Sequence, residues 1–331
     1  MKFPFYTNQP LQPPHSTPVE LPPSRQLLTT RPAAYLPDDG LVDAVNVALL
    51  LGQPLLLTGE PGTGKTQLAY HLAYQLGLGE PLKFETKSTS TARDLFYIYD
   101  ALGRFHAIQA AQLGDRLSKN SIDYLTYNAL GQAIILTNPP NQIKAYLPQD
   151  LIYTEPRRSV VLIDEVDKAP RDFPNDILNE VENQYFRIPE LGNITIKADP
   201  NLAPILILTS NSEKHLPDAF LRRCIYYDIP FPDLARLTKI IEAHLGEWVK
   251  HSNDFMAAAL KLFWQLRQSG LRKQPSTAEL LNWLMVLREM FPKENNPLAT
   301  QPNLVLRTLS SLVKTQADQQ AAQRLLGFEP D

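Results

Sequence analysis

The feature that most constrains this chain is a glycine-rich loop enclosed by two regular elements. The loop reads Gly59-Glu60-Pro61-Gly62-Thr63-Gly64-Lys65-Thr66, and the apolar run 54–58 precedes it. After the loop, apolar residues recur at helical spacing as far as Leu76. Closely spaced glycines let backbone N–H groups surround phosphate oxygens, and the following helix directs its positive end at them. The order strand, loop, helix therefore predicts a phosphate-binding loop in an α/β fold.

Two side chains of this loop have a predicted chemical part. Lys65 is expected to bring an ammonium group to the outer phosphates of a bound nucleotide, and Thr66 to offer its hydroxyl to Mg²⁺. An ordinary glycine-rich turn is the alternative, and the flanking strand and helix disfavour it. The remaining predicted cofactor-binding positions are Gly59, Glu60, Pro61, Gly62, Thr63, Gly64 and Gln67.

A second apolar run, 159–163, ends in the adjacent carboxylates Asp164 and Glu165. We predict that Asp164 holds Mg²⁺ through water, and that Glu165 polarises the water that attacks the γ-phosphate. A carboxylate pair can also cap the next helix or lie in solvent, and Asp167 is a weaker candidate beyond the strand end. The position at the end of a buried strand favours a hydrolysing site.

A third apolar run, 204–210, ends in Asn211. Its amide would orient the same water without placing a formal charge near the γ-phosphate. Asn-Ser pairs also begin turns, so a turn-forming role is the alternative. The succession of three strands favours the site, and we assign Asn211 to it together with Lys65 and Glu165.

Composition and length predict three regions along the chain. Nine of the 29 prolines fall in residues 1–37, which predicts a proline-rich extended arm that either drapes over a neighbour or is a tail without function. Residues 38–232 are expected to form the α/β domain, with a hairpin at 185–197. Lys65 and Asp164 are 99 residues apart, more than one helix and one strand need, which predicts an insert around 88–153. Residues 233–331 show only helical periods, at 234–249, 255–268, 277–290 and 304–326, with a capping box at Ser276 to Glu279.

The net charge of −3 and the absence of a long basic run argue against nucleic acid as the main partner. No apolar run approaches the roughly 18 residues that a membrane span needs. The start of the chain is interrupted by prolines before a signal-like apolar segment develops, and the single cysteine, Cys224, excludes an intramolecular disulfide. We expect a cytoplasmic protein with no nucleic-acid or membrane partner.

These motifs resemble those of AAA+ ATPases, and over about residues 35–291 they are most similar to the MoxR type, in the clade that also holds GvpN-, NorQ- and McrB-like ATPases. The resemblance matches Gly59–Thr66 to Walker A, Val160–Glu165 to Walker B and Asn211 to sensor 1. It implies an AAA+ P-loop NTPase core, a parallel sheet flanked by helices, followed by an all-α lid domain. It also implies ATP and Mg²⁺ as ligands and a homo-oligomeric ring, hexameric in the family.

The segment 216–224 resembles the stretch that carries the family's arginine finger, with Arg223 the closer match and Arg222 beside it. Such a finger acts on the ATP of a neighbouring subunit, since a guanidinium stabilises charge on phosphoryl oxygens. Two surface arginines are the alternative. The family's sensor-2 arginine is missing, because Ala278 stands in its place. Arg272 and Lys273 remain as either substitutes for it or solvated charges at a helix entry.

The resemblance implies a chaperone-like ATPase that remodels or activates a partner protein, in this family one with a von Willebrand factor A domain. The rival is an ATP-gated oligomeric switch in a signalling or defence system, which controls an effector without repeated mechanical work. A motor on nucleic acid is a third reading, and the lack of a basic surface disfavours it.

Overall fold

The computed structural model describes residues 31–112, 120–148, 151–211, 215–246, 253–291 and 296–325. The chain forms two compact units. The sheet unit consists of Pro37–Glu60 and Gly64–Pro230. The helical unit consists of the described residues within Met1–Leu36, Pro61–Thr63 and Phe231–Asp331. No helix in the described ranges is long and apolar enough to cross a membrane.

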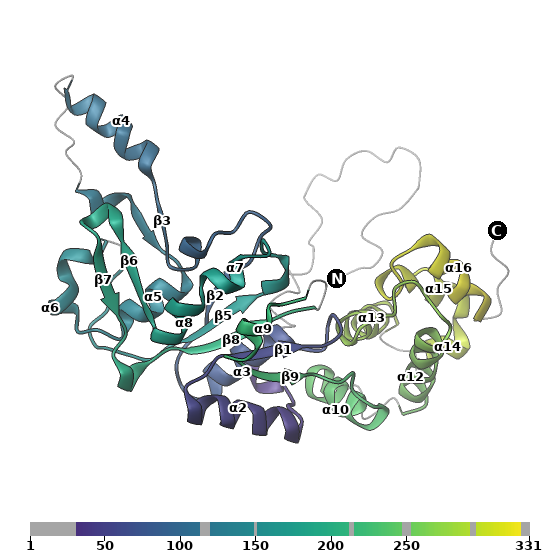
Figure 1. The fold of residues 1–331 in the computed structure, drawn as a ribbon. Coiled ribbons are helices and arrows are strands. Elements are labelled where there is room, and N and C mark those ends of the chain that lie inside the picture. Colours follow the sequence, from purple (N-terminus) through teal and green to yellow (C-terminus); the bar gives the residue numbers. More distant parts are fainter. Residues whose placement is uncertain are drawn as a thin grey trace. The chain divides into compact units, whose positions relative to one another are not determined.

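Five parallel strands form the sheet unit's centre, in the order β2-β5-β8-β1-β9 (Figure 1). The central strands β5, β8 and β1 are buried along nearly their whole length, which explains their continuous apolar sequence. Because all five strands run parallel, their carboxyl ends meet at one edge of the sheet. The predicted α/β class, a parallel sheet flanked by helices, is confirmed. The strands are β1 (Leu55–Thr58), β2 (Leu82–Glu85), β5 (Val160–Asp164), β8 (Ile205–Thr209) and β9 (Ile225–Asp228).

The two edge strands, β2 and β9, were not predicted from the sequence. In β2 the charged residues Lys83 and Glu85 alternate with apolar ones, and in β9 every second residue is exposed. An edge strand has fewer neighbours, so it lacks the apolar run that marks a central strand. Helix α2 contacts β1 and β9, α3 contacts β5 and β8, and α5 contacts β2 and β5. The helices and turns around the sheet are α2 (Asp39–Leu51), α3 (Lys65–Gln75), α5 (Ala129–Leu136), η5 (Val166–Lys168), α7 (Phe173–Asp176), α8 (Leu178–Asn183), η7 (Pro200–Leu202) and α9 (Asp218–Leu221).

The long segment between α3 and β5 forms a small antiparallel pair that carries a projecting helix. The strands β3 (Tyr97–Tyr99) and β4 (Leu125–Tyr127) pair with each other, and α4 (Ala101–Gln112) extends away from the sheet between them (Figure 1). Residues 113–119 and 149–150 of the predicted insert lie outside the described residues. The other elements of this segment are η2 (Ala92–Leu95), η3 (Ser121–Tyr124), α6 (Pro140–Ile143) and η4 (Lys144–Tyr146).

A hairpin forms at residues 185–197, from β6 (Tyr185–Ile188) and β7 (Ile194–Lys197), with η6 (Pro189–Leu191) in its turn. Phe186 of β6 is buried, and its ring stacks on Phe96 at a centroid distance of 5.4 Å. The Tyr97 hydroxyl donates a hydrogen bond of 2.9 Å to Glu190 in the hairpin turn. These contacts fasten the hairpin to the β3 segment.

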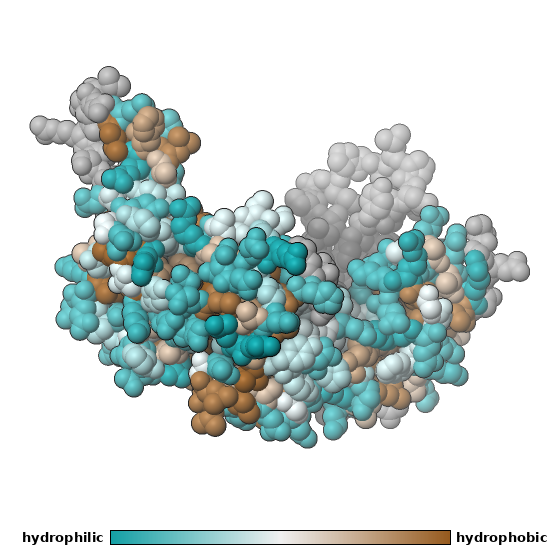
Figure 2. Space-filling view, viewed as in Figure 1, coloured by the Kyte–Doolittle hydropathy of each residue, from teal (hydrophilic) through white to brown (hydrophobic). Residues whose placement is uncertain are grey.

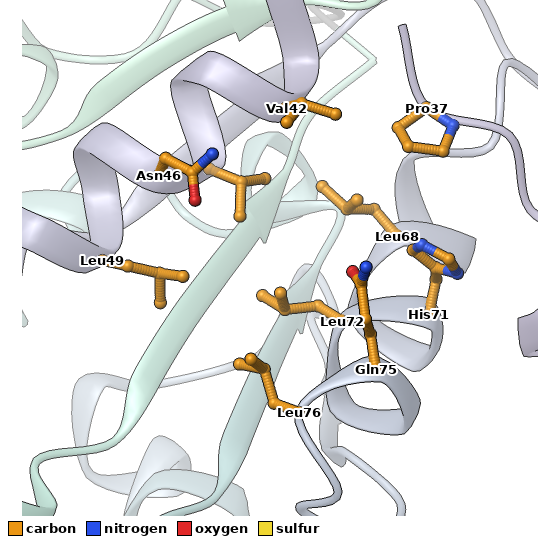
Figure 3. Close-up of a pocket in the computed structure, with 10 residues that line it drawn as sticks. Pro37, Val42, Asn46, Leu49, Leu68, His71, Leu72, Gln75 and Leu76 are labelled. Atoms are coloured by element: carbon orange, nitrogen blue, oxygen red, sulfur yellow. The ribbon is translucent and has the colours of Figure 1, made fainter. Parts of the chain in front are cut away.

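Two helices of the sheet unit present exposed hydrophobic residues. They lie on α2, where Leu50 is 85 % exposed, and on α4, where Leu102, Phe105 and Ile108 are exposed. Figure 2 shows hydrophobic surface over α2 and on α4. Next to the hydrophobic surface of α2, a pocket of about 330 Å³ lies between α2 and α3. It is lined mostly by aliphatic side chains such as Leu49 and Leu72 (Figure 3).

The helical unit is built around a core that includes Phe263, Trp283 and Leu309. The Trp283 indole N–H donates to the Thr308 hydroxyl at 2.8 Å, which satisfies the one polar group of that buried ring. The predicted capping box begins α13, since the hydroxyl of Ser276 accepts from the Glu279 amide. The elements are η1 (Pro32–Ala34), α10 (Leu234–Leu245), α12 (Asn253–Gln268), α13 (Thr277–Met290), α14 (Pro297–Thr300), α15 (Pro302–Leu306), η8 (Leu309–Ser311) and α16 (Gln316–Leu325).

Two expectations need correction. The single helix predicted over 304–326 is broken into α15, η8 and α16, because the Thr315 hydroxyl accepts from the Asp318 amide and begins a new helix. Of the predicted extended arm 1–37, residues 1–30 lie outside the described residues. Its described end is not extended throughout, since Pro32 begins the 3-10 turn η1, where a proline φ angle suits the first helical position.

Asp318 connects α16 to the segment between α12 and α13. Its carboxylate accepts from the backbone amides of Arg272, at 2.9 Å, and Lys273, at 3.2 Å. The carboxylate is buried, and it fixes the backbone of the two residues that were possible substitutes for the missing sensor-2 arginine. Burial acts to raise the pKa of Asp318, but these amides and the Thr315 hydroxyl outweigh it, and the net pKa is lowered.

We therefore expect Asp318→Asn to lower the melting temperature at pH 7. A carboxylate with a lowered pKa stabilises the fold above its ordinary value of about 4, and that stabilisation is lost as the pH falls through the lowered folded value. The difference between variant and wild type should shrink below about pH 4, as followed by thermal unfolding in circular dichroism. Asp254→Asn, at an exposed carboxylate, is the control. Equal melting temperatures at pH 7 would contradict this role of Asp318.

Candidate active site

The glycine-rich loop follows β1 and leads directly into α3, which begins at Lys65. Gly59, Gly62 and Gly64 have φ angles of 132°, 79° and 95°, a range that other residues rarely adopt, so the loop conformation requires glycine at these positions. The Lys65 ammonium donates to the carbonyl oxygens of Gly59, at 2.7 Å, and Glu60, at 3.1 Å. It thus lies folded back over the loop. Gln67 lies in the first turn of α3, where backbone amides have no acceptor within the helix and suit an anion.

The two predicted Mg²⁺ residues lie together at the carboxyl edge of the sheet. The Thr66 hydroxyl donates to Asp164 Oδ1 at 3.0 Å. Thr209 donates to the same oxygen at 2.7 Å, and its hydroxyl accepts from the Glu165 amide at 2.8 Å. Thr209 was not among the residues predicted from the sequence. Its place two residues before Asn211 was the only signal for it.

A lysine from the edge strand reaches the same carboxylate. Lys83 Nζ lies 3.1 Å from Asp164 Oδ2 and 2.6 Å from Glu85 Oε1. Burial acts to lower the pKa of Lys83, but the hydrogen bonds to Glu85 and Asp164 outweigh it, so the pKa is raised and the group is an ammonium at neutral pH. Lys83 was not predicted from the sequence, because its strand has no apolar run.

Glu165 and Asn211, predicted to act on the same water, are in contact. The Asn211 amide donates to Glu165 Oε1 at 3.1 Å, and Lys168 bonds to Oε2 at 2.5 Å. Glu165 has a φ angle of 56°, an uncommon backbone conformation for a residue other than glycine, of the kind that gathers at functional sites. Asp167, the weaker candidate, is buried and accepts from the Asn211 backbone amide at 3.4 Å. Its contact therefore supports the Asn211 segment.

Several carboxylates surround the Lys65 ammonium. Burial lowers the pKa of Lys65, and the negative charges of Asp167, Asp164, Glu165 and Asp228 oppose this effect. The pKa of Lys65 is lowered on balance. A site with this excess of carboxylates over ammonium groups suits a bound cation.

Arg223 lies outside this cluster of described residues. Its guanidinium pairs with Glu182 at 3.0 Å and donates to the Ala219 carbonyl at 3.0 Å. Arg222 and Arg223 are both exposed, in the turn after α9. In this chain Arg223 therefore faces solvent and a partner on α8.

The donor set fits a magnesium nucleotide. Mg²⁺ is usually held by one or two protein oxygen ligands, with phosphates and water completing its shell. The Thr66 hydroxyl and Asp164 carboxylate provide such oxygens, and Lys65 with the loop amides suits the phosphates. Within the described ranges, no group of three or more His, Cys, Asp or Glu residues is arranged to hold a metal ion. A metal at the Thr66 and Asp164 oxygens would therefore need phosphate or water to complete its shell.

Solved structures with a related arrangement include the RuvB Holliday junction branch migration motor of Thermotoga maritima, at 15 % identity and a TM-score of 0.42, covering 92 % of this chain and 83 % of that one. Domain III of the Thermotoga maritima replication initiation protein DnaA has 13 % identity and a TM-score of 0.42, covering 90 % of this chain and all 100 % of that one. Likenesses this distant carry no argument about activity. A search among curated proteins found no match.

The sequence profile of the AAA domain, dynein-related subfamily, matches residues 54–224. This stretch contains the glycine-rich loop, the Asp164-Glu165 pair and Asn211. It covers more than half of the chain, so this protein belongs to the AAA domain family, in its dynein-related subfamily.

Proposed function

We propose that this protein hydrolyses ATP to ADP and phosphate, and that it is a cytoplasmic MoxR-type AAA+ ATPase that remodels or activates a partner protein. The observation that supports hydrolysis most strongly is the Glu165–Asn211 contact of 3.1 Å beside the Thr66–Asp164 pair. A site for binding alone needs no such carboxylate next to the metal ligands.

In the proposed reaction, Lys65 and the loop amides hold the phosphates, and Thr66 and Asp164 hold Mg²⁺. The metal neutralises charge on the phosphoryl oxygens when it is bound. Glu165 polarises a water, whose oxygen forms a bond to the γ-phosphorus as the bond to the bridging oxygen of ADP breaks. The proton of that water passes toward Glu165, and Asn211 holds the carboxylate in position. The Glu165–Lys168 pair is partly exposed, so water can replace the lysine at little cost.

We further propose that ATP is bound between subunits of a homo-oligomeric ring, a hexamer as in the MoxR family. Support comes from Arg223, which lies outside its own chain's cluster and is exposed at the protein surface. Exposed hydrophobic residues on α2 provide surface that assembly would bury. The client is proposed to be a protein, and the family suggests one with a von Willebrand factor A domain.

The test is phosphate release by the purified protein with Mg²⁺ and ATP, measured over a range of protein concentrations and combined with mass photometry. If the site is completed by a neighbouring subunit, the rate per chain should rise steeply with concentration and level off where the ring mass appears. A constant rate per chain from a monomer would contradict the composite site. No phosphate release at any concentration would contradict hydrolysis and favour an ATP-gated switch.

A further inference from the structure

The pairing of β2 with β5 places three charged side chains on one face of the sheet. Glu85 lies directly opposite Asp164 in the parallel register, and Lys83 is two residues earlier on the same strand. Alternate residues of a strand share a face, so Lys83, which lies opposite Leu162, is on the same face as Glu85 and Asp164. Lys83 Nζ bridges the two acids, at 2.6 Å from Glu85 and 3.1 Å from Asp164.

The two oxygens of Asp164 have different partners. Oδ1 accepts from the hydroxyls of Thr66 and Thr209. Oδ2 is the oxygen that the Lys83 ammonium contacts. The side chain of Asp164 is 11 % exposed and that of Lys83 is 29 % exposed, so solvent screens this pair less than a surface ion pair. An ammonium thus neutralises the carboxylate that we assign to Mg²⁺.

We propose that Lys83 is a positioning residue that competes with the divalent cation for Asp164 and so sets the metal affinity of the site, an inference that rests on the proposed nucleotide-binding function. Glu85 is 69 % exposed in its side chain and lies at the shorter distance, so it can retain the ammonium when Asp164 turns to the metal. Before the nucleotide and the metal bind, the Asp164 carboxylate is therefore neutralised by the Lys83 ammonium. In this proposal Lys83 lowers the metal affinity of the site and Glu85 raises it.

The test is titration of ADP-loaded protein with Mn²⁺, followed by the electron paramagnetic resonance signal of the free ion. Lys83→Gln should bind Mn²⁺ roughly three- to tenfold more tightly than wild type, because it removes one positive charge next to Oδ2. Glu85→Gln should bind it roughly two- to threefold more weakly, because the ammonium then has only Asp164. Lys87→Gln is the matched control, since Lys87 lines the same pocket as Lys83 and its loss removes the same charge.

Lys83→Arg should retain wild-type Mn²⁺ affinity, because it keeps the cation. Metal-free ADP binding and thermal unfolding are measured for every variant. A damaged fold would lower the Mn²⁺ affinity, whereas a gain is expected for Lys83→Gln. Equal or weaker Mn²⁺ binding by Lys83→Gln, with ADP binding intact, overturns the role of Lys83 and leaves the proposed function standing. An equal gain of Mn²⁺ affinity in Lys87→Gln would show that overall charge, and not the contact with Asp164, causes the effect. That result would also overturn the role of Lys83. Failure of the wild type to bind ADP at all would overturn the proposed function and this role together.

Discussion

Replacing Glu165 with glutamine is expected to reduce ATP hydrolysis at least about 100-fold, while ATP binding stays close to wild type. The amide keeps the shape of the side chain and its contact with Asn211, but it cannot take a proton from water. Lys65, Thr66 and Asp164, which hold the nucleotide in our assignment, remain unchanged. The measurement is steady-state phosphate release together with the affinity for a fluorescent ATP analogue.

Glu155→Gln is the matched control for this change, because Glu155 is an exposed carboxylate outside the site. Its hydrolysis rate should equal that of wild type. Retention of more than about a tenth of the wild-type rate in Glu165→Gln would exclude Glu165 as the group that activates water. Loss of ATP binding in the same variant would instead assign Glu165 to the binding of nucleotide.

The second large effect is expected at Arg223. Arg223→Ala should lower hydrolysis by about 10³-fold, the lower end of the range for arginine fingers, with ATP binding and ring mass unchanged. Lysine should not restore the rate, since an ammonium lacks the planar fork of the guanidinium. Arg222→Ala is the neighbouring control and should stay near wild type. Glu182→Gln should not lower the rate, because it only releases Arg223 from its partner within the chain.

Mixing two inactive variants decides whether Arg223 acts on a neighbouring subunit. Glu165→Gln chains retain Arg223, and Arg223→Ala chains retain Glu165, so a mixed ring contains some complete sites. Phosphate release from the mixture should exceed the sum of the two variants alone. No recovery, despite mixed assembly seen by mass photometry, would show that Arg223 does not complete a neighbour's site.

Local sequence was sufficient to predict the central strands, the glycine-rich loop and the capped helix α13. β1, β5 and β8 are buried on both faces, so their need for apolar residues is visible as runs in the sequence. The loop requires glycine wherever its φ angle is positive. Because strand ends carry the polar residues of a parallel sheet, Asp164, Glu165 and Asn211 could be assigned by their order alone.

Contacts between distant segments were decided by the tertiary structure. Lys83 and Asp164 are 81 positions apart (164 − 83), and only the pairing of β2 with β5 brings them to 3.1 Å. Thr209 on the neighbouring strand β8 donates to the carboxylate that we assign to Mg²⁺, and Glu182 of α8 pairs with Arg223 in the turn after α9. A sequence pattern reports burial and backbone preference, which are local properties. Strand order and register determine which charges meet, and they arise from packing across the whole sheet.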